Sequence, residues 1–168
     1  MPVKYRRSKN MLKNIELIKQ QEYTIPIRQY FEIVAKKVDI YAVLLFGSVA
    51  RGDAKSFHSY ESDIDIIVII KNLPPDLGKR MLYKMDVESG TRSRVQSIWM
   101  TPKELEEHIE AKSEYVLEAF ESGIILFDPE GYLAKKISDL FMELKSKGVS
   151  RLKWGWSWNI KAGEVVEL

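Results

Sequence analysis

Two aspartates stand two residues apart at the start of an apolar run, in the segment Ser62-Asp63-Ile64-Asp65-Ile66. Side chains two positions apart in a strand project from the same face, so Asp63 and Asp65 would lie together while the isoleucines enter the core. Adjacent carboxylates repel each other unless a cation lies between them. Mg²⁺ binds proteins through one or two carboxylates, waters and substrate phosphates, so the pair is a candidate Mg²⁺ or Mn²⁺ site. The alternative is a solvated strand start.

A Gly47-Ser48 turn follows an earlier apolar run. Without a Cβ, Gly47 would let the backbone approach a ligand closely. The Ser48 hydroxyl, beside backbone N–H groups at the start of a short helix, would complete an anion site suited to nucleotide phosphates. Arg51 either helps to position phosphate or is an exposed arginine on a helix surface. Taken alone, a Gly-Ser pair after a strand is also a common turn.

Three apolar, strand-length segments would position these groups. Ile40–Phe46 stops at the glycine, Asp63–Ile70 begins with the aspartates, and Arg94–Met100 is closed by Thr101-Pro102. An amphipathic helix is expected over Pro26–Val38, where apolar residues recur at helical spacing.

A second helix is expected over Asp76–Gly90, with four apolar residues directed toward a core: Leu77, Met81, Leu82 and Met85. Thr101 suits a helix N-cap, Pro102 the first helical position and Glu104 a capping box. Helical patterns continue to Glu121 with a break near Ala111–Ser113.

The remaining expected elements are a strand at Ile124–Phe127, a helix at Tyr132–Lys147 ended by Gly148, and a short helix within Met11–Gln20. Helices alternating with strands predict an α/β fold with a small sheet flanked by helices, although the strand order cannot be read from the pattern. The chain divides into a basic lead-in (residues 1–24), a core (25–110), and a helical extension with a tryptophan-rich tail packed on the same domain (111–168).

Together, the glycine-serine turn, the nearby Arg51-Gly52 and the Asp-x-Asp pair resemble the minimal nucleotidyltransferases of the DNA polymerase β-like superfamily. The resemblance implies a nucleotidyltransferase fold with a mixed sheet. It implies that Gly47, Ser48 and Arg51 bind the phosphates of a nucleoside triphosphate, with ATP the first choice, and that Asp63 and Asp65 hold Mg²⁺ as the catalytic pair. The implied activity is transfer of a nucleoside monophosphate to a hydroxyl acceptor of unspecified kind.

Two features depart from that family pattern. Relatives commonly carry a third carboxylate on the next strand, where this chain has Gln96, which cannot act as a general base; the nearest acids are Asp86 and Glu88. The loop over residues 53–61 is long and aromatic, and packing is favoured over stacking on a base. The missing acid favours the alternative function, an antitoxin-like nucleotide- and metal-binding module, weakly active or inactive, paired with a small helical HEPN-type protein.

The composition sets the outer limits. The 168 residues carry a net charge of +2, which is too small to predict nucleic-acid binding by bulk electrostatics and leaves such binding open. The chain has no cysteine, no apolar stretch long enough to span a bilayer and no evident signal peptide, so we expect a cytoplasmic protein. The two histidines are isolated, and the segment Trp154–Trp158 is expected to fold back on the core rather than form a binding platform.

Overall fold

The computed structural model describes residues 12–91 and 94–159. Four strands form one sheet in the order β3-β2-β1-β4: β1 (Ile40–Phe46), β2 (Ile64–Ile70), β3 (Val95–Met100) and β4 (Ile124–Phe127). Strand β1 is antiparallel to β2 and β4, whereas β2 and β3 are parallel. The sheet is therefore mixed, as expected, and the single parallel pair requires a crossover, which a helix supplies.

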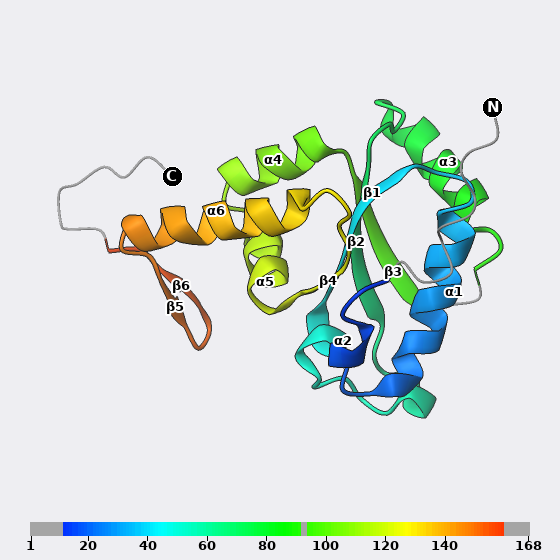
Figure 1. The fold of residues 1–168 in the computed structure, drawn as a ribbon, viewed down its shortest axis with the longest axis horizontal. Coiled ribbons are helices and arrows are strands. Elements are labelled where there is room, and N and C mark those ends of the chain that lie inside the picture. The colour runs from blue at the N-terminus through cyan, green and yellow to red at the C-terminus, as the bar shows by residue number, and fades with distance from the viewer. Residues whose placement is uncertain (1–11, 92–93, 160–168) are drawn as a thin grey trace.

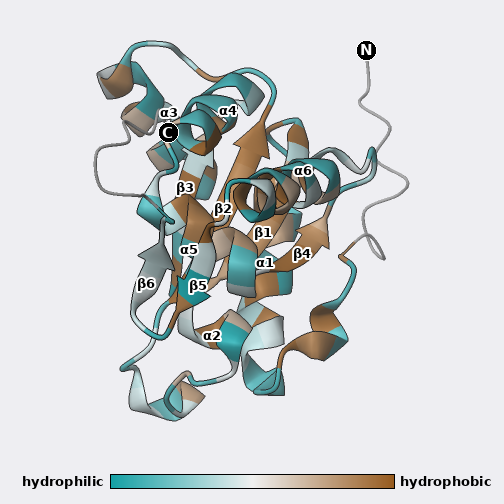
Figure 2. Cartoon of the chain, turned by 90° about the vertical axis from the view of Figure 1, so that its left-hand side faces the viewer, coloured by the Kyte–Doolittle hydropathy of each residue, from teal (hydrophilic) through white to brown (hydrophobic). Residues whose placement is uncertain are grey.

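Helices cover both faces of this sheet (Figure 1). One face carries α1 (Thr24–Val34) and α3 (Leu77–Glu88), the helix of the β2–β3 crossover. The other face carries α4 (Pro102–Glu110), α5 (Glu114–Ser122) and α6 (Tyr132–Ser146). Figure 2 shows the central strands mostly in brown between these helical layers. In the part of the chain that the structure describes, no helix has the length and apolarity to cross a membrane.

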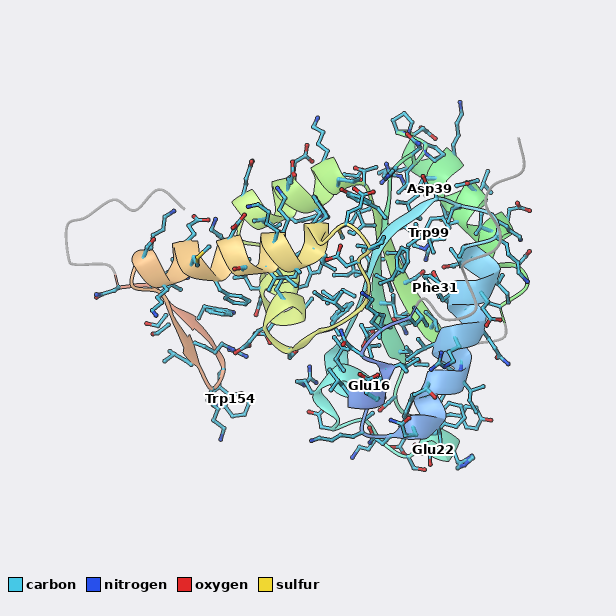
Figure 3. All side chains as sticks on the ribbon, in the orientation of Figure 1. Glu16, Glu22, Phe31, Asp39, Trp99 and Trp154 are labelled. Atoms are coloured by element: carbon cyan, nitrogen blue, oxygen red, sulfur yellow. The ribbon has the colours of Figure 1, made fainter. Side chains whose placement is uncertain are left out.

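Alternation along β2 assigns its side chains to two separate cores. Ile64 and Ile66 pack under α1 with the β1 residues Val43 and Leu45. Ile67 and the rest of its face pack under α4, α5 and α6. Phe31 and Trp99 mark the first of these layers in Figure 3. Asp65 is two residues from Ile67, so its side chain projects from the same face of the sheet, the one covered by α4, α5 and α6.

The capping box predicted for α4 is confirmed. The Thr101 hydroxyl accepts from the Glu104 amide at 3.2 Å, and the Glu104 carboxylate accepts from the Thr101 amide at 2.7 Å. The break between α4 and α5 falls at residues 111–113. The helix stop at Gly148 is also as expected, since its φ is +70°.

The prediction that α3 directs Leu77, Met81, Leu82 and Met85 toward a core is wrong, because these side chains are 61–76% exposed. The helix packs through its other side instead. Val87 is buried, and the Tyr83 ring meets Trp99 edge-on at 6.3 Å.

The N-terminal segment also differs from expectation. Within residues 12–20 the only helical turn is a 3₁₀ turn, Ile15–Leu17, where a short helix over Met11–Gln20 was expected; Met11 lies outside the described residues. The backbone here is held by β4 rather than by a helix: the Lys13 amide donates to Leu126 at 2.8 Å, and the Asn14 amide side chain to Ile125 at 2.9 Å. A second 3₁₀ turn, Gln21–Tyr23, leads into α1.

The tryptophan-rich tail forms a hairpin that was not predicted, β5 (Ser150–Leu152) and β6 (Gly155–Ser157). The expected packing is confirmed for Trp156, which stacks on Phe141 at 5.9 Å, and for Trp158, which is partly buried against the second core. Trp154 is 88% exposed at the hairpin tip, where Figure 3 labels it. Residues 160–168 of the tail lie outside the described residues.

Candidate functional site

The predicted turn lies directly against one of the two aspartates. Phe46, the last residue of β1, is paired across the sheet with Asp65, so the next residue, Gly47, approaches the Asp65 side chain. A Cβ on Gly47 would collide with Asp65 Oδ2 and stand 3.1 Å from Asp65 Cγ. Gly47 also has a φ of +71°, in the left-handed region. Two independent constraints therefore require glycine where the turn meets the carboxylate.

A short helix begins at this glycine. Helix α2 spans Gly47–Arg51, follows an extended Phe46 that provides no side-chain cap, and exposes first-turn N–H groups that have no intrahelical partner. Its end is closed by the Ser48 carbonyl, which accepts from the amides of Gly52, Asp53 and Ala54 at 2.9–3.1 Å. The Ser48 hydroxyl is thus carried on a compact, backbone-bonded turn beside Asp65.

Asp63 and Asp65 lie on one side of β2, as the alternation predicts. Asp63 is exposed and immediately precedes the strand, whereas Asp65 is half-buried within it; Ile64 and Ile66 are fully buried on the opposite face. Burial raises the pKa of the Asp65 carboxyl, the Asp63 charge raises it further, and the Arg51 guanidinium opposes both effects. The two carboxylates are close enough to repel each other, which is the electrostatic condition that a divalent cation relieves.

Arg51 is exposed and is bound to Asp53 by an ion pair of 3.2 Å. Its charge still acts on Asp65. The structure therefore brings together Gly47, Ser48, Arg51, Asp63 and Asp65, all five residues of the predicted site.

Gln96 lies next to the two aspartates, on the neighbouring strand β3. It is paired with Asp65 in the parallel β2–β3 register, and its side-chain Nε2 donates to Asp63 Oδ2 at 2.6 Å. Gln96 therefore shares a face of the sheet with the two aspartates. Asp86 and Glu88, the nearest acids in the sequence, both lie on α3. Glu88 accepts hydrogen bonds from the hydroxyls of Tyr30 at 2.7 Å and Ser97 at 2.5 Å, and Asp86 is exposed.

A cavity of about 420 Å³ opens beside Asp65 and Gln96. Phe46 and Ile98 line it with apolar surface, and Lys84 and Ser97, both of which are bound to Glu88, line it as well. Lys84 and Ser97 were not identified from the sequence, because the crossover helix α3 and the edge strand β3 that carry them meet only in the folded chain. The site therefore has a space large enough for part of a second ligand next to the carboxylates.

The packing expected for the aromatic loop is confirmed for Phe57, which is partly buried against the core, whereas Tyr60 is 75% exposed. Tyr23 meets the Phe57 ring edge-on at 5.1 Å, and its hydroxyl donates to the Lys55 carbonyl at 2.8 Å. Arg94 lies 4.5 Å from the Phe57 ring centre and 4.7 Å from that of Tyr60, and donates to the Phe57 carbonyl at 2.7 Å. These contacts fix the loop between the glycine turn and the aspartates. Tyr23 and Arg94 were not identified from the sequence, since both are remote from the loop along the chain.

The described residues contain no group of three or more His, Cys, Asp or Glu side chains that could hold a metal ion. His58 packs on Phe57 at 5.7 Å. His108 contacts the Ser113 hydroxyl at 3.0 Å and the Tyr115 ring at 5.1 Å, which agrees with a surface or packing role for an isolated histidine.

Comparison with known proteins adds a family match that covers more than half of the chain. Residues 28–129 match the family described as Polymerase beta, Nucleotidyltransferase. A solved structure described as a toxin–antitoxin with AMP-PNP is similar at a TM-score of 0.43 and 18% identity, over 70% of this chain and 89% of that chain. A mutant of the toxin–antitoxin pair MntA–HpeT is similar at 0.43 and 18%, over 73% and 91%. No curated protein matches the chain.

Proposed function

The chain belongs to the polymerase beta nucleotidyltransferase family, and on that premise we propose that it transfers a nucleoside monophosphate from a nucleoside triphosphate to an acceptor hydroxyl, with Mg²⁺ or Mn²⁺. One observation carries the proposal: the Gly47 backbone contacts the Asp65 carboxylate so closely that a Cβ on residue 47 would overlap it. A phosphate-binding turn and a metal-binding carboxylate in direct contact are what a metal–triphosphate complex requires, because the cation and the phosphates share oxygen ligands.

Each residue then has a distinct role. The backbone at Gly47 and the hydroxyl of Ser48 bind the terminal phosphates, and Arg51 adds positive charge beside them. Asp63 and Asp65 would hold the divalent cation, whose charge would favour the ionised form of Asp65 against the burial and the Asp63 charge that raise its pKa. When bound, that cation neutralises phosphate charge and favours in-line displacement at the α-phosphorus.

In the proposed reaction the acceptor hydroxyl loses its proton to solvent water as its oxygen bonds to the α-phosphorus; the bond from that phosphorus to the oxygen bridging to the β-phosphorus breaks, and pyrophosphate leaves. We assign the acceptor to the cavity lined by Asp65, Gln96 and Ser97, because it opens beside the carboxylates. ATP is the nucleotide of first choice, and the acceptor can be a protein side chain, an RNA end or a small molecule.

The direct test is incubation of the full chain with each of the four nucleoside triphosphates, labelled at the α-phosphate, with Mg²⁺ and a panel of these acceptor classes. We expect label to be transferred from at least one nucleotide, and to be lost with Asp65→Asn. Ser138→Ala, an exposed change on α6, is the matched control and should leave transfer unchanged. Transfer that survives Asp65→Asn would contradict the assigned site.

A second candidate function is supported by Gln96. Its amide faces Asp63 where relatives are expected to carry a carboxylate, and an amide cannot accept a proton from an acceptor hydroxyl. In this alternative the chain is an antitoxin-like module that binds nucleotide and metal, has little or no activity, and pairs with a small helical HEPN-type protein. Saturable nucleotide binding without transfer to any acceptor, together with co-purification of such a protein, would favour it over the enzyme.

A further inference from the structure

Helix α3 presents an apolar face to solvent. Leu77 is 76% exposed, Met81 61%, Leu82 65% and Met85 62%. They recur at intervals of four, one and three residues, so they form one continuous stripe. The helix lies at the periphery of the molecule in both ribbon views (Figures 1 and 2). Contiguous apolar residues of this size on a surface are characteristic of an interface, and methionine is enriched in such interfaces.

A glycine lies on the same face. Gly78 precedes Met81 by three residues and Leu82 by four, and it is exposed. A Cβ on Gly78 would meet only Asp76 Oδ1, at an ordinary contact distance of 3.4 Å, so the fold does not require glycine there. Glycine weakens a helix relative to alanine. Because Gly78 has no side chain, a second helix could approach the exposed face of α3 closely at this position.

Two exposed charges of opposite sign flank the stripe. Lys79 and Asp86 are seven residues apart, which is two helical turns, so they lie along the same side of Leu82. If a second α3 packed antiparallel on the first, each Lys79 would lie opposite Asp86 of the other copy. A two-fold axis would therefore create two complementary ion pairs beside an apolar centre.

From the apolar stripe, Gly78 and this self-complementary charge pattern, we propose that α3 is the interface of a symmetric homodimer in which the two α3 helices pack antiparallel. The four apolar side chains are covered by the same four from the second copy. None of these four lines the cavity beside Asp65, to which α3 contributes only Lys84.

The test is the mass of the full chain in solution, measured by sedimentation equilibrium over a wide concentration range. We expect a dimer that Leu82→Glu converts to a monomer whose far-UV circular dichroism is that of the wild type, because Leu82 is exposed in the protomer and its replacement does not disturb the fold. The matched control is Met142→Glu, which changes an equally exposed residue on α6 and should leave the dimer intact. A wild type that stays monomeric to its solubility limit, or a dimer that Leu82→Glu leaves unchanged, overturns the proposal. Capture of a different protein by a monomeric wild type overturns it as well.

Charge reversal tests the antiparallel arrangement. Lys79→Glu and Asp86→Lys should each weaken dimerisation about two- to tenfold, since each puts like charges opposite one another twice. The double variant restores both pairs with reversed sign and should return to within about twofold of the wild type. A double variant as weak as the sum of the two single changes would overturn the antiparallel packing.

Discussion

The side-chain amide of Gln96 donates a 2.6 Å hydrogen bond to the carboxylate of Asp63. The bond orients Asp63 without adding negative charge to the pair formed with Asp65. It also fills the place on β3 that faces both aspartates, since Asp65 and Gln96 are neighbours in register. Gln96 therefore has direct consequences for both cation affinity and turnover.

We predict that Gln96→Glu tightens Mg²⁺ binding, because it adds a third carboxylate beside Asp63 with little change in side-chain length. It should also increase nucleotidyl transfer, by up to about 10²–10⁴-fold where loss of a general base limits the wild type. Calorimetric Mg²⁺ titration and a transfer assay measure the two effects. Gln96→Met, which removes the hydrogen bond and adds no charge, is the control and should give neither gain. Wild-type transfer as fast as that of Gln96→Glu would show that another group acts as the base.

We predict that Gly47→Ala abolishes nucleotide binding, since the added methyl group must displace the Asp65 carboxylate. Gly131→Ala is the matched control: Gly131 has nearly the same φ, +69°, but open space around the new Cβ. Both substitutions incur the left-handed backbone strain of about 1 kcal/mol. Denaturant unfolding should show a larger loss for Gly47→Ala, and calorimetry should show that Gly131→Ala binds nucleotide normally. Normal binding by Gly47→Ala would contradict the contact between the turn and Asp65.

The raised pKa of Asp65 predicts how stability depends on pH. Burial and the Asp63 charge favour the protonated carboxyl in the folded chain, so the folded state binds this proton more tightly than the unfolded state. The stability that Asp65 contributes is therefore present at acidic pH and is lost as pH rises through its folded pKa. We expect Asp65→Asn to be more stable than the metal-free wild type at neutral pH, by about 0.5–1 kcal/mol, and to lose that advantage below about pH 4.

Urea unfolding of both proteins in the presence of a chelator measures this difference. Asp139→Asn, a change at a more exposed carboxylate on α6, is the comparison. An Asp65→Asn variant that is less stable than the wild type at neutral pH would contradict this. It would mean that favourable contacts stabilise the charged carboxylate more than burial and repulsion from Asp63 destabilise it.

Much of this site could be predicted because its signals are local. The strands Ile40–Phe46 and Ile124–Phe127 have the predicted limits. Each is a short apolar run followed by a residue that favours a turn, Gly47 after the first and Asp128 after the second. The spacing of Asp63 and Asp65 within such a run determines their common face. The place of Gln96 followed from the family resemblance, which puts a carboxylate on the next strand where this chain has glutamine.

The errors arose where tertiary contacts override local pattern. Apolar spacing indicates that α3 has an apolar face but cannot show whether the chain itself covers that face, and Leu82 and its neighbours are exposed. The segment before α1 lacks an α-helix because Lys13 and Asn14 bond to β4, more than 100 residues away. The hairpin in the tryptophan-rich tail packs on Phe141, a partner that the local sequence does not reveal.

The most direct test of the nucleotide site is calorimetric titration of the full chain with Mg²⁺–ATP, repeated with the other three nucleotides, with a chelator, and with Asp63→Asn and Asp65→Asn. We predict saturable binding that requires the metal, raises the melting temperature, and disappears in both variants while their far-UV circular dichroism stays unchanged. At a nucleotide concentration of 100 times the Kd, the stabilisation should be about 2.7 kcal/mol. Absence of binding and of any melting shift for all four nucleotides at millimolar concentration would contradict the account, as would full binding in the Asp65→Asn variant.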